Sequence, residues 1–112
     1  MKTPRLNRQL VLEAKDQAPD GAGGFVQSWR ILGAMWAEVV SRSGGDRAGE
    51  AGPMAATGYR ITVRGAPVGS SMRPEPGQRF REGSRVFRID AVGEKDPEAR
   101  FLLCFAEEEV AA

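Results

Sequence analysis

GYRITVRG, residues 58–65, alternates apolar and polar side chains without interruption. Tyr59, Ile61 and Val63 take every second position, with Arg60, Thr62 and Arg64 between them. Successive side chains of a β-strand point to opposite faces, so this pattern predicts a strand with one buried face. We expect Arg60 and Arg64 to point away from the core.

The same period of two appears near the N-terminus, in LNRQLVLEA at residues 6–14. One face carries Leu6, Leu10, Leu12 and Ala14 together with Arg8, and the other carries Asn7, Gln9, Val11 and Glu13. This pattern predicts a half-buried first strand. DQAPDGAGGF follows at residues 16–25, and its Pro, Asp and Gly residues favour a hairpin-type reversal.

Residues 26–40, VQSWRILGAMWAEVV, fit two structures. Ile31, Met35 and Val39 recur at the i+4 spacing of a helix. Gly33, the β-branched residues at 39–40 and the two tryptophans favour a strand instead. We therefore predict a long second strand with a bulge at Gly33.

Two further stretches complete an all-β pattern. RFREGSRVFRIDAV, residues 79–92, predicts a tight hairpin in which Phe87, Ile89 and Ala91 share one face. RFLLCFAEE, residues 100–108, is apolar on both faces, as in a central strand or one covered by a neighbouring subunit. The fold prediction is a small β-barrel or sandwich of about six antiparallel strands. It forms one domain over residues 1–112, with a long loop at about 41–58 between the second and third strands.

Composition limits the chemistry that is available. The chain has 112 residues, no histidine and a single cysteine, Cys104, inside an apolar stretch. Histidine is the commonest general base and metal ligand, so its absence argues against ordinary zinc sites and catalytic triads. The N-terminus has no apolar signal region, and no window reaches the roughly 18 apolar residues of a membrane span. We expect a soluble, non-secreted protein in which Cys104 is a buried apolar residue.

No stretch carries an enzymatic signature. GAGG at residues 21–24 lacks the Lys-Ser/Thr of a phosphate-binding loop, and Ser70 and Ser71 have no assignable base. We therefore expect no catalytic residues, no metal and no cofactor. Trp29 and Trp36 fit either a small β core or an interface anchor.

Charge is segregated along the chain. Residues 60–88 hold seven arginines and two glutamates, whereas residues 89–112 hold seven acids and two bases. This asymmetry indicates either a polyanionic partner or complementary faces where identical subunits meet. A free-standing barrel of the OB or SH3 type that binds nucleic acid or peptide remains the alternative.

Taken in order, these stretches resemble the phage head–tail joining family, whose members are also called head-closure, stopper or head–tail adaptor proteins. The matching positions are Arg8, Asp20 with Gly21 and Gly24, Trp29, Trp36 with Ala37, Arg60 with Ile61, Arg85 with Phe87 and Ile89, and Leu102 with Cys104. The connector at residues 66–78 is richer in proline and glycine than the family pattern.

The resemblance implies a structural neck protein of a tailed phage or a gene transfer agent, assembled in the bacterial cytoplasm. Such proteins form rings of six or twelve subunits between a portal or adaptor and a tail terminator or tail tube protein. They close the DNA channel and involve no membrane. The long loop then projects toward DNA or a neighbouring ring, with Arg42, Asp46, Arg47 and Glu50 as its contact residues. Contacts between subunits are expected at Arg60, Arg64, Glu107, Glu108 and Glu109.

Overall fold

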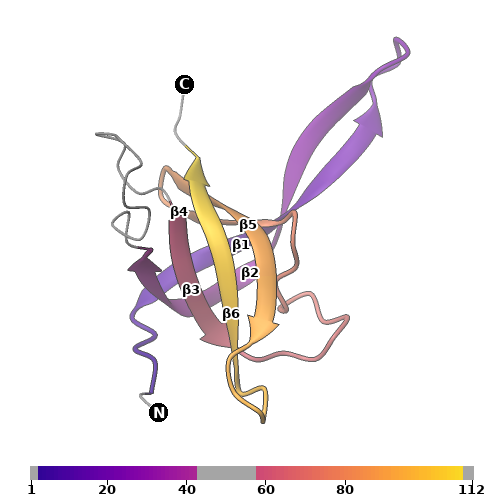
Figure 1. Ribbon diagram of the computed structural model, residues 1–112. Coiled ribbons are helices and arrows are strands. Elements are labelled where there is room, and N and C mark those ends of the chain that lie inside the picture. The colour runs from indigo at the N-terminus through magenta and orange to yellow at the C-terminus, as the bar shows by residue number, and fades with distance from the viewer. Residues whose placement is uncertain (1–2, 43–57, 110–112) are drawn as a thin grey trace, which may run out of the picture.

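Six antiparallel strands close into a barrel in a computed structural model that describes residues 3–42 and 58–109 (Figure 1). Around the barrel the strands follow the order β1-β2-β3-β6-β5-β4. Their bounds are β1 Arg8–Pro19, β2 Phe25–Ser41, β3 Gly58–Arg64, β4 Arg79–Glu82, β5 Arg85–Glu94 and β6 Phe101–Glu109. The predicted all-β fold is confirmed, and so is the choice of a strand over a helix for residues 26–40.

The core is built from the inward-facing positions of all six strands. Its fully buried apolar residues are Leu10, Leu12, Ala37, Ile61, Val63, Phe80, Phe87, Ile89, Leu102, Cys104 and Ala106. β6 contributes three of them at alternate positions, while Phe101, Leu103 and Phe105 lie half-buried on its outer side. The lone cysteine is buried as predicted, and desolvation raises the pKa of the Cys104 thiol to about 12.

β2 contains a β-bulge, which changes which of its side chains face the inside of the barrel. Leu12 pairs with Gly33 and Glu13 with Ile31, so Leu32 is the extra residue on the β2 side. The predicted bulge therefore lies beside Gly33. An extra residue reverses the in-and-out alternation, because side-chain period in a strand is two.

A second bulge corrects one prediction in β5. Ile89 pairs with Ala106 and Ala91 with Phe105, which leaves Asp90 as the extra residue. Ala91 is consequently exposed on the outside of the barrel, and Val92 packs against the core instead. The prediction that Ala91 shares the buried face of Phe87 and Ile89 is wrong for this reason.

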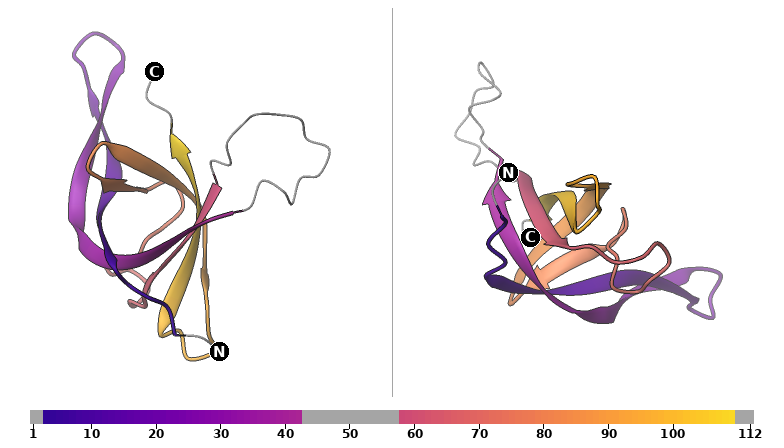
Figure 2. Two further views of the ribbon diagram at one scale, coloured as in Figure 1. Left: turned by 90° about the vertical axis from the view of Figure 1, so that its left-hand side faces the viewer. Right: turned by 90° about the horizontal axis from the view of Figure 1, so that it is seen from below.

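The first hairpin extends well beyond the barrel (Figures 1 and 2). β1 and β2 continue to pair up to Pro19 and Phe25, past the last β1–β4 pair of Glu13 with Arg79. We call residues 14–30 the β1–β2 arm. The predicted reversal closes its tip, where Asp20 Oδ1 accepts hydrogen bonds from the amides of residues 22 and 24 at 2.7 and 3.0 Å.

The turn between β5 and β6 packs tightly against the end of β3. The Asp96 carboxylate is buried and accepts hydrogen bonds from Arg100 Nε at 2.9 Å and from the Phe101 amide at 3.1 Å. The Gly65 amide donates to the Arg100 carbonyl at 2.7 Å. A side chain at position 65 would collide with the carbonyl oxygen of Ala99, so this approach requires glycine.

Candidate functional site

One mouth of the barrel gathers most of the predicted contact residues. β2 and β6 end there, β3 begins there, and the β4–β5 hairpin turns there, as the pairings of Ser41 with Tyr59 and Glu82 with Arg85 require. The connection that spans residues 43–57 leaves and re-enters the barrel at this mouth. Residues far apart in the sequence thus meet beside the predicted projecting loop.

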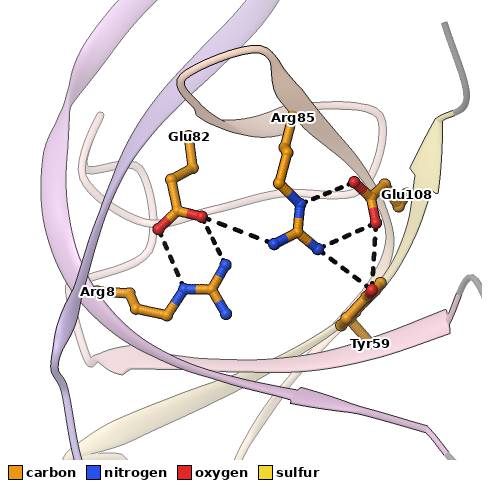
Figure 3. Close-up of polar contacts among 5 residues, drawn as sticks. All are labelled: Arg8, Tyr59, Glu82, Arg85 and Glu108. Atoms are coloured by element: carbon orange, nitrogen blue, oxygen red, sulfur yellow. Dashed lines mark hydrogen bonds and ion pairs between the residues drawn. The ribbon is translucent and has the colours of Figure 1, made fainter.

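Charged side chains replace apolar ones in the last inward-facing layer at this mouth. Arg8 lies two positions before the buried Leu10, and Glu108 lies two positions after the buried Ala106, so both point inward. Together with Tyr59, Glu82 and Arg85 they form a connected network, which we call the mouth layer (Figure 3). Its residues come from β1, β3, β4, β5 and β6.

Two arginine–carboxylate side-chain pairs make up most of the mouth layer. Arg8 binds Glu82 through both Nη2 and Nε, at 2.5 and 3.0 Å. Arg85 binds Glu108 in the same two-point manner, from Nε at 2.8 Å and from Nη2 at 3.1 Å. Arg85 Nη1 also lies 4.0 Å from Glu82, which joins the two pairs. Such bidentate pairs fix both distance and orientation.

Tyr59 connects the mouth layer to the core. Its hydroxyl donates to Glu108 at 3.1 Å and accepts from Arg85 at 3.2 Å. Its ring meets the buried ring of Phe87 edge to face, with centroids 5.1 Å apart. The Arg85 guanidinium also lies 5.0 Å from the Phe87 ring. The charged layer therefore seals the apolar core at this end.

The ion pairs shift the pKa values of the residues that they join. The hydrogen bond from Arg8 lowers the pKa of Glu82, and the hydrogen bond from Arg85, supported by Tyr59, lowers that of Glu108. The carboxylates in turn raise the pKa values of both arginines. All four groups are charged near neutral pH.

A second ionic cluster lies outside the barrel, at the base of the β1–β2 arm. Glu13 is buried and accepts hydrogen bonds from Arg79 Nε at 2.7 Å and from Arg81 Nε at 2.9 Å. The Arg79 guanidinium stacks 4.0 Å from the ring of Trp29. Burial raises the pKa of Glu13, but the two arginine hydrogen bonds outweigh it and the pKa is lowered.

Two of the acidic residues that were expected to contact a neighbouring subunit, Glu107 and Glu108, lie at the mouth. Each already binds an arginine of its own chain. Glu107 accepts a hydrogen bond from Arg88 at 2.8 Å, and Glu108 belongs to the mouth layer. Glu109 is exposed. Arg60 and Arg64 are exposed on β3 as predicted, with Arg60 near this mouth and Arg64 at the opposite end of the strand.

Arg42 differs from the expectation of a projecting contact residue. Its amide donates to the Gly58 carbonyl at 2.8 Å, and its Nη2 approaches the Ala106 carbonyl at 3.5 Å. The guanidinium lies 5.9 Å from the Phe105 ring, so the side chain folds back over β6. The other predicted loop residues, Asp46, Arg47 and Glu50, lie outside the described residues.

The sequence carries one signal for the mouth layer, at Arg8. Arg8 shares the inward face of Leu10 and Leu12, and a buried arginine requires a carboxylate partner. Nothing in the local pattern identifies that partner, because Glu82 is 74 residues away along the chain.

Trp36 is 54% exposed, so burial in the core is excluded for this tryptophan.

Within residues 3–42 and 58–109, no group of three or more His, Cys, Asp or Glu side chains could hold a metal ion. The same residues include no helix that could span a membrane. The recurring chemistry of the described surface is instead the pairing of arginine with carboxylate.

Comparisons with known structures point to phage-like particles. A chain from the virion of a native gene transfer agent particle superposes with a TM-score of 0.76 at 50% sequence identity, covering 97% of this chain and 100% of that one. The solution structure of protein SF1141 from Shigella flexneri 2a gives a TM-score of 0.72 at 20% identity, over the full length of both chains. That second likeness supports the fold alone.

Sequence comparisons agree with the structural ones. A search of proteins with curated descriptions found no match. The family model for the phage head completion protein matches residues 1–109, which is nearly the whole sequence. This chain therefore belongs to the phage head completion protein family.

Proposed function

We propose that this protein is a structural neck component of a tailed phage or of a gene transfer agent, without enzymatic activity. The observation that carries the proposal is the 50% identity to a chain of a gene transfer agent virion, over 97% of this sequence. Membership of the head completion family supports the same role. The proposed place of action is the neck of the particle, after assembly in the bacterial cytoplasm.

In this role the protein forms a ring that joins the portal or an adaptor above to a tail terminator or tail tube protein below. We favour six subunits, which would match a six-fold tail, over twelve, which would match a portal. The mouth layer supports such a role because it locks the strand ends into a rigid frame. A rigid frame is suited to hold neighbouring parts at fixed distances.

The connection between β2 and β3 is proposed to help close the DNA channel. It starts at the barrel mouth, where Arg42 marks its first residue and Gly58 its return. Asp46, Arg47 and Glu50 are the proposed contacts with DNA or with the next ring. Contact with double-stranded DNA would be electrostatic and would not read its sequence.

Subunit contacts are proposed to involve the exposed arginines of β3, Arg60 and Arg64, and the acidic end of β6, residues 107–109. Glu107 and Glu108 already bind arginines of their own chain. They would therefore contribute to a neighbour as parts of charged clusters and not as free carboxylates. Glu109 is exposed and available for a direct contact.

Deleting the gene tests the role directly. We expect tailless heads that leak their DNA, because the channel is not closed, together with free tails that assemble without their connection. Supplying the gene in trans should restore tailed particles. Normal numbers of complete, tailed particles in the deletion strain would contradict the proposed function.

A further inference from the structure

Arg42 follows directly after β2, and its side chain folds back over the outside of the barrel. The guanidinium covers Gly58, where an added Cβ would lie 2.5 Å from both Nε and Nη2 of Arg42. Nη2 reaches the carbonyl oxygen of Ala106 at 3.5 Å, and the ring centroid of Phe105 lies 5.9 Å from Cζ. The guanidinium therefore occupies space that is open because residue 58 has no side chain.

This folded-back position holds Arg42 weakly. Its Nε is buried and has no hydrogen-bond partner among the described residues. A buried N–H without an acceptor is destabilising, because it has lost its water and gained nothing in return. The hydrogen bond to Ala106 is 3.5 Å long, whereas a typical N–H···O bond measures about 2.9 Å. The contacts that keep the side chain in place are thus few and poor.

The arginines of the neighbouring strands are held quite differently. Every arginine of β1, β2, β4 and β5 binds a carboxylate of its own chain. In the part of the chain that the structure describes, neither Arg42 nor Arg60 forms such a pair. A charge that no acid holds is the one most easily recruited by an incoming anion.

The charged groups around the guanidinium do little to retain it. Gly58 and Arg60 are successive residues on the outer face of β3, so Arg60 lies beside Arg42 and the two like charges repel each other. Glu107 pairs in register with Gly58, but its carboxylate already accepts a hydrogen bond from Arg88 at 2.8 Å. The nearest acid of the chain is therefore engaged elsewhere.

We propose that Arg42 is a releasable anion contact, which lies over Gly58 in the free chain and turns away to bind a phosphate of duplex DNA in the assembled neck. A guanidinium matches phosphate oxygens with two parallel hydrogen bonds, so the phosphate would supply the acceptor that Nε lacks. The inference rests on the proposed function, which brings DNA to this mouth of the barrel. It adds a contact residue whose conformation depends on the partner.

Gly58→Ala tests the release while it leaves the charge of Arg42 intact. The added methyl group would overlap the guanidinium, which is the far end of a flexible side chain and can move aside. The variant should therefore release Arg42 without DNA. The Nε–H resonance of Arg42, assigned by its absence in Arg42→Gln, reports the release by NMR. We expect slow exchange with water in the wild type and fast exchange in Gly58→Ala.

Binding of a duplex DNA oligonucleotide, followed by fluorescence anisotropy over a series of salt concentrations, tests the phosphate contact. We expect Gly58→Ala to bind several-fold tighter than the wild type. Its salt dependence should be steeper by about 0.9 in log–log slope, the value for one added phosphate contact. The double variant Gly58→Ala, Arg42→Gln should lose this gain. Gly93→Ala is the matched control, because nothing lies within 4 Å of its added Cβ, and it should bind as the wild type does.

Four results would overturn the proposal. These are an Arg42 Nε–H that exchanges fast in the wild type or stays protected in Gly58→Ala, equal DNA affinity of the wild type and Gly58→Ala, a gain that persists in the double variant, and no DNA binding by any variant. None of them bears on the neck role itself. That role would instead be contradicted by complete, tailed particles from the deletion strain.

Discussion

Arg85 on β5 and Glu108 on β6 face each other at the barrel mouth through two hydrogen bonds, 2.8 Å from Nε to Oε2 and 3.1 Å from Nη2 to Oε1. The Tyr59 hydroxyl donates to the same carboxylate at 3.1 Å. Three strands are thus joined at one carboxylate.

Replacing Glu108 with Gln should destabilise the barrel. The variant keeps the shape of the side chain but loses the charge that holds Arg85 and Tyr59. We expect a loss of about 1 kcal/mol in the free energy of unfolding, since the pair is partly exposed to water. Urea unfolding followed by tryptophan fluorescence measures it. Glu109→Gln is the matched control on the exposed side and should leave stability unchanged; an equal effect from both variants would contradict the role of the mouth layer.

Stability should fall in acid because the carboxylates of both ionic clusters titrate at lower pH in the folded chain. The pKa values of Glu13, Glu82 and Glu108 are all lowered from an ordinary value of 4.5. A lowered folded pKa means that the stabilisation is complete above the unfolded value and disappears as the pH falls through the folded one.

We therefore expect the free energy of unfolding to be steady from pH 7 to about pH 5 and to decline below it. Denaturant unfolding at a series of pH values measures this. The double variant Glu82→Gln, Glu108→Gln should show a weaker decline. Stability that rises on acidification would show that these carboxylates are not held by their arginines.

Substituting Ala for Gly65 should weaken the contact between β3 and the β5–β6 turn. A Cβ at this position would overlap the backbone carbonyl oxygen of Ala99, and backbone cannot move aside cheaply. We expect a loss of roughly 1–3 kcal/mol in the free energy of unfolding, as for other overpacked sites. Gly93→Ala is the control, because nothing lies within 4 Å of the Cβ that it adds. The expectation fails if the two variants unfold at the same denaturant concentration.

The thiol of Cys104 should be unreactive in the folded protein. It is buried in the core, and desolvation raises its pKa to about 12, so almost no thiolate exists at pH 8. A chromogenic disulfide reagent should label it only after denaturant is added. Stoichiometric labelling of the native protein at pH 8 would show that the core is open at β6.

The strand pattern could be predicted from the sequence because one face of each strand is buried. Alternation identified Tyr59, Ile61 and Val63 on β3, and the structure buries Ile61 and Val63 completely. The same rule failed at Ala91. A single extra residue at Asp90 reverses the alternation, and bulges carry no reliable signal in composition.

The candidate site was harder to predict than the fold. Its parts meet only through strand pairing, as with Arg8 and Glu82, which are 74 residues apart. The segregation of charge indicated that basic and acidic segments would meet. It did not indicate that Arg85 and Arg88 would meet the acids of β6 within one chain. The sequence also did not predict that Trp36 is exposed, because both faces of residues 26–40 are rich in apolar residues.

We propose that copies of this chain form a ring at the neck of a particle. Cryo-electron microscopy of purified particles, with focused refinement between head and tail, would show whether this ring is present. We expect a closed ring of six-stranded barrels at that position, with the segment between β2 and β3 directed toward the channel. A map in which the neck contains no such barrel, or in which the barrel occurs as isolated copies elsewhere on the particle, would contradict it.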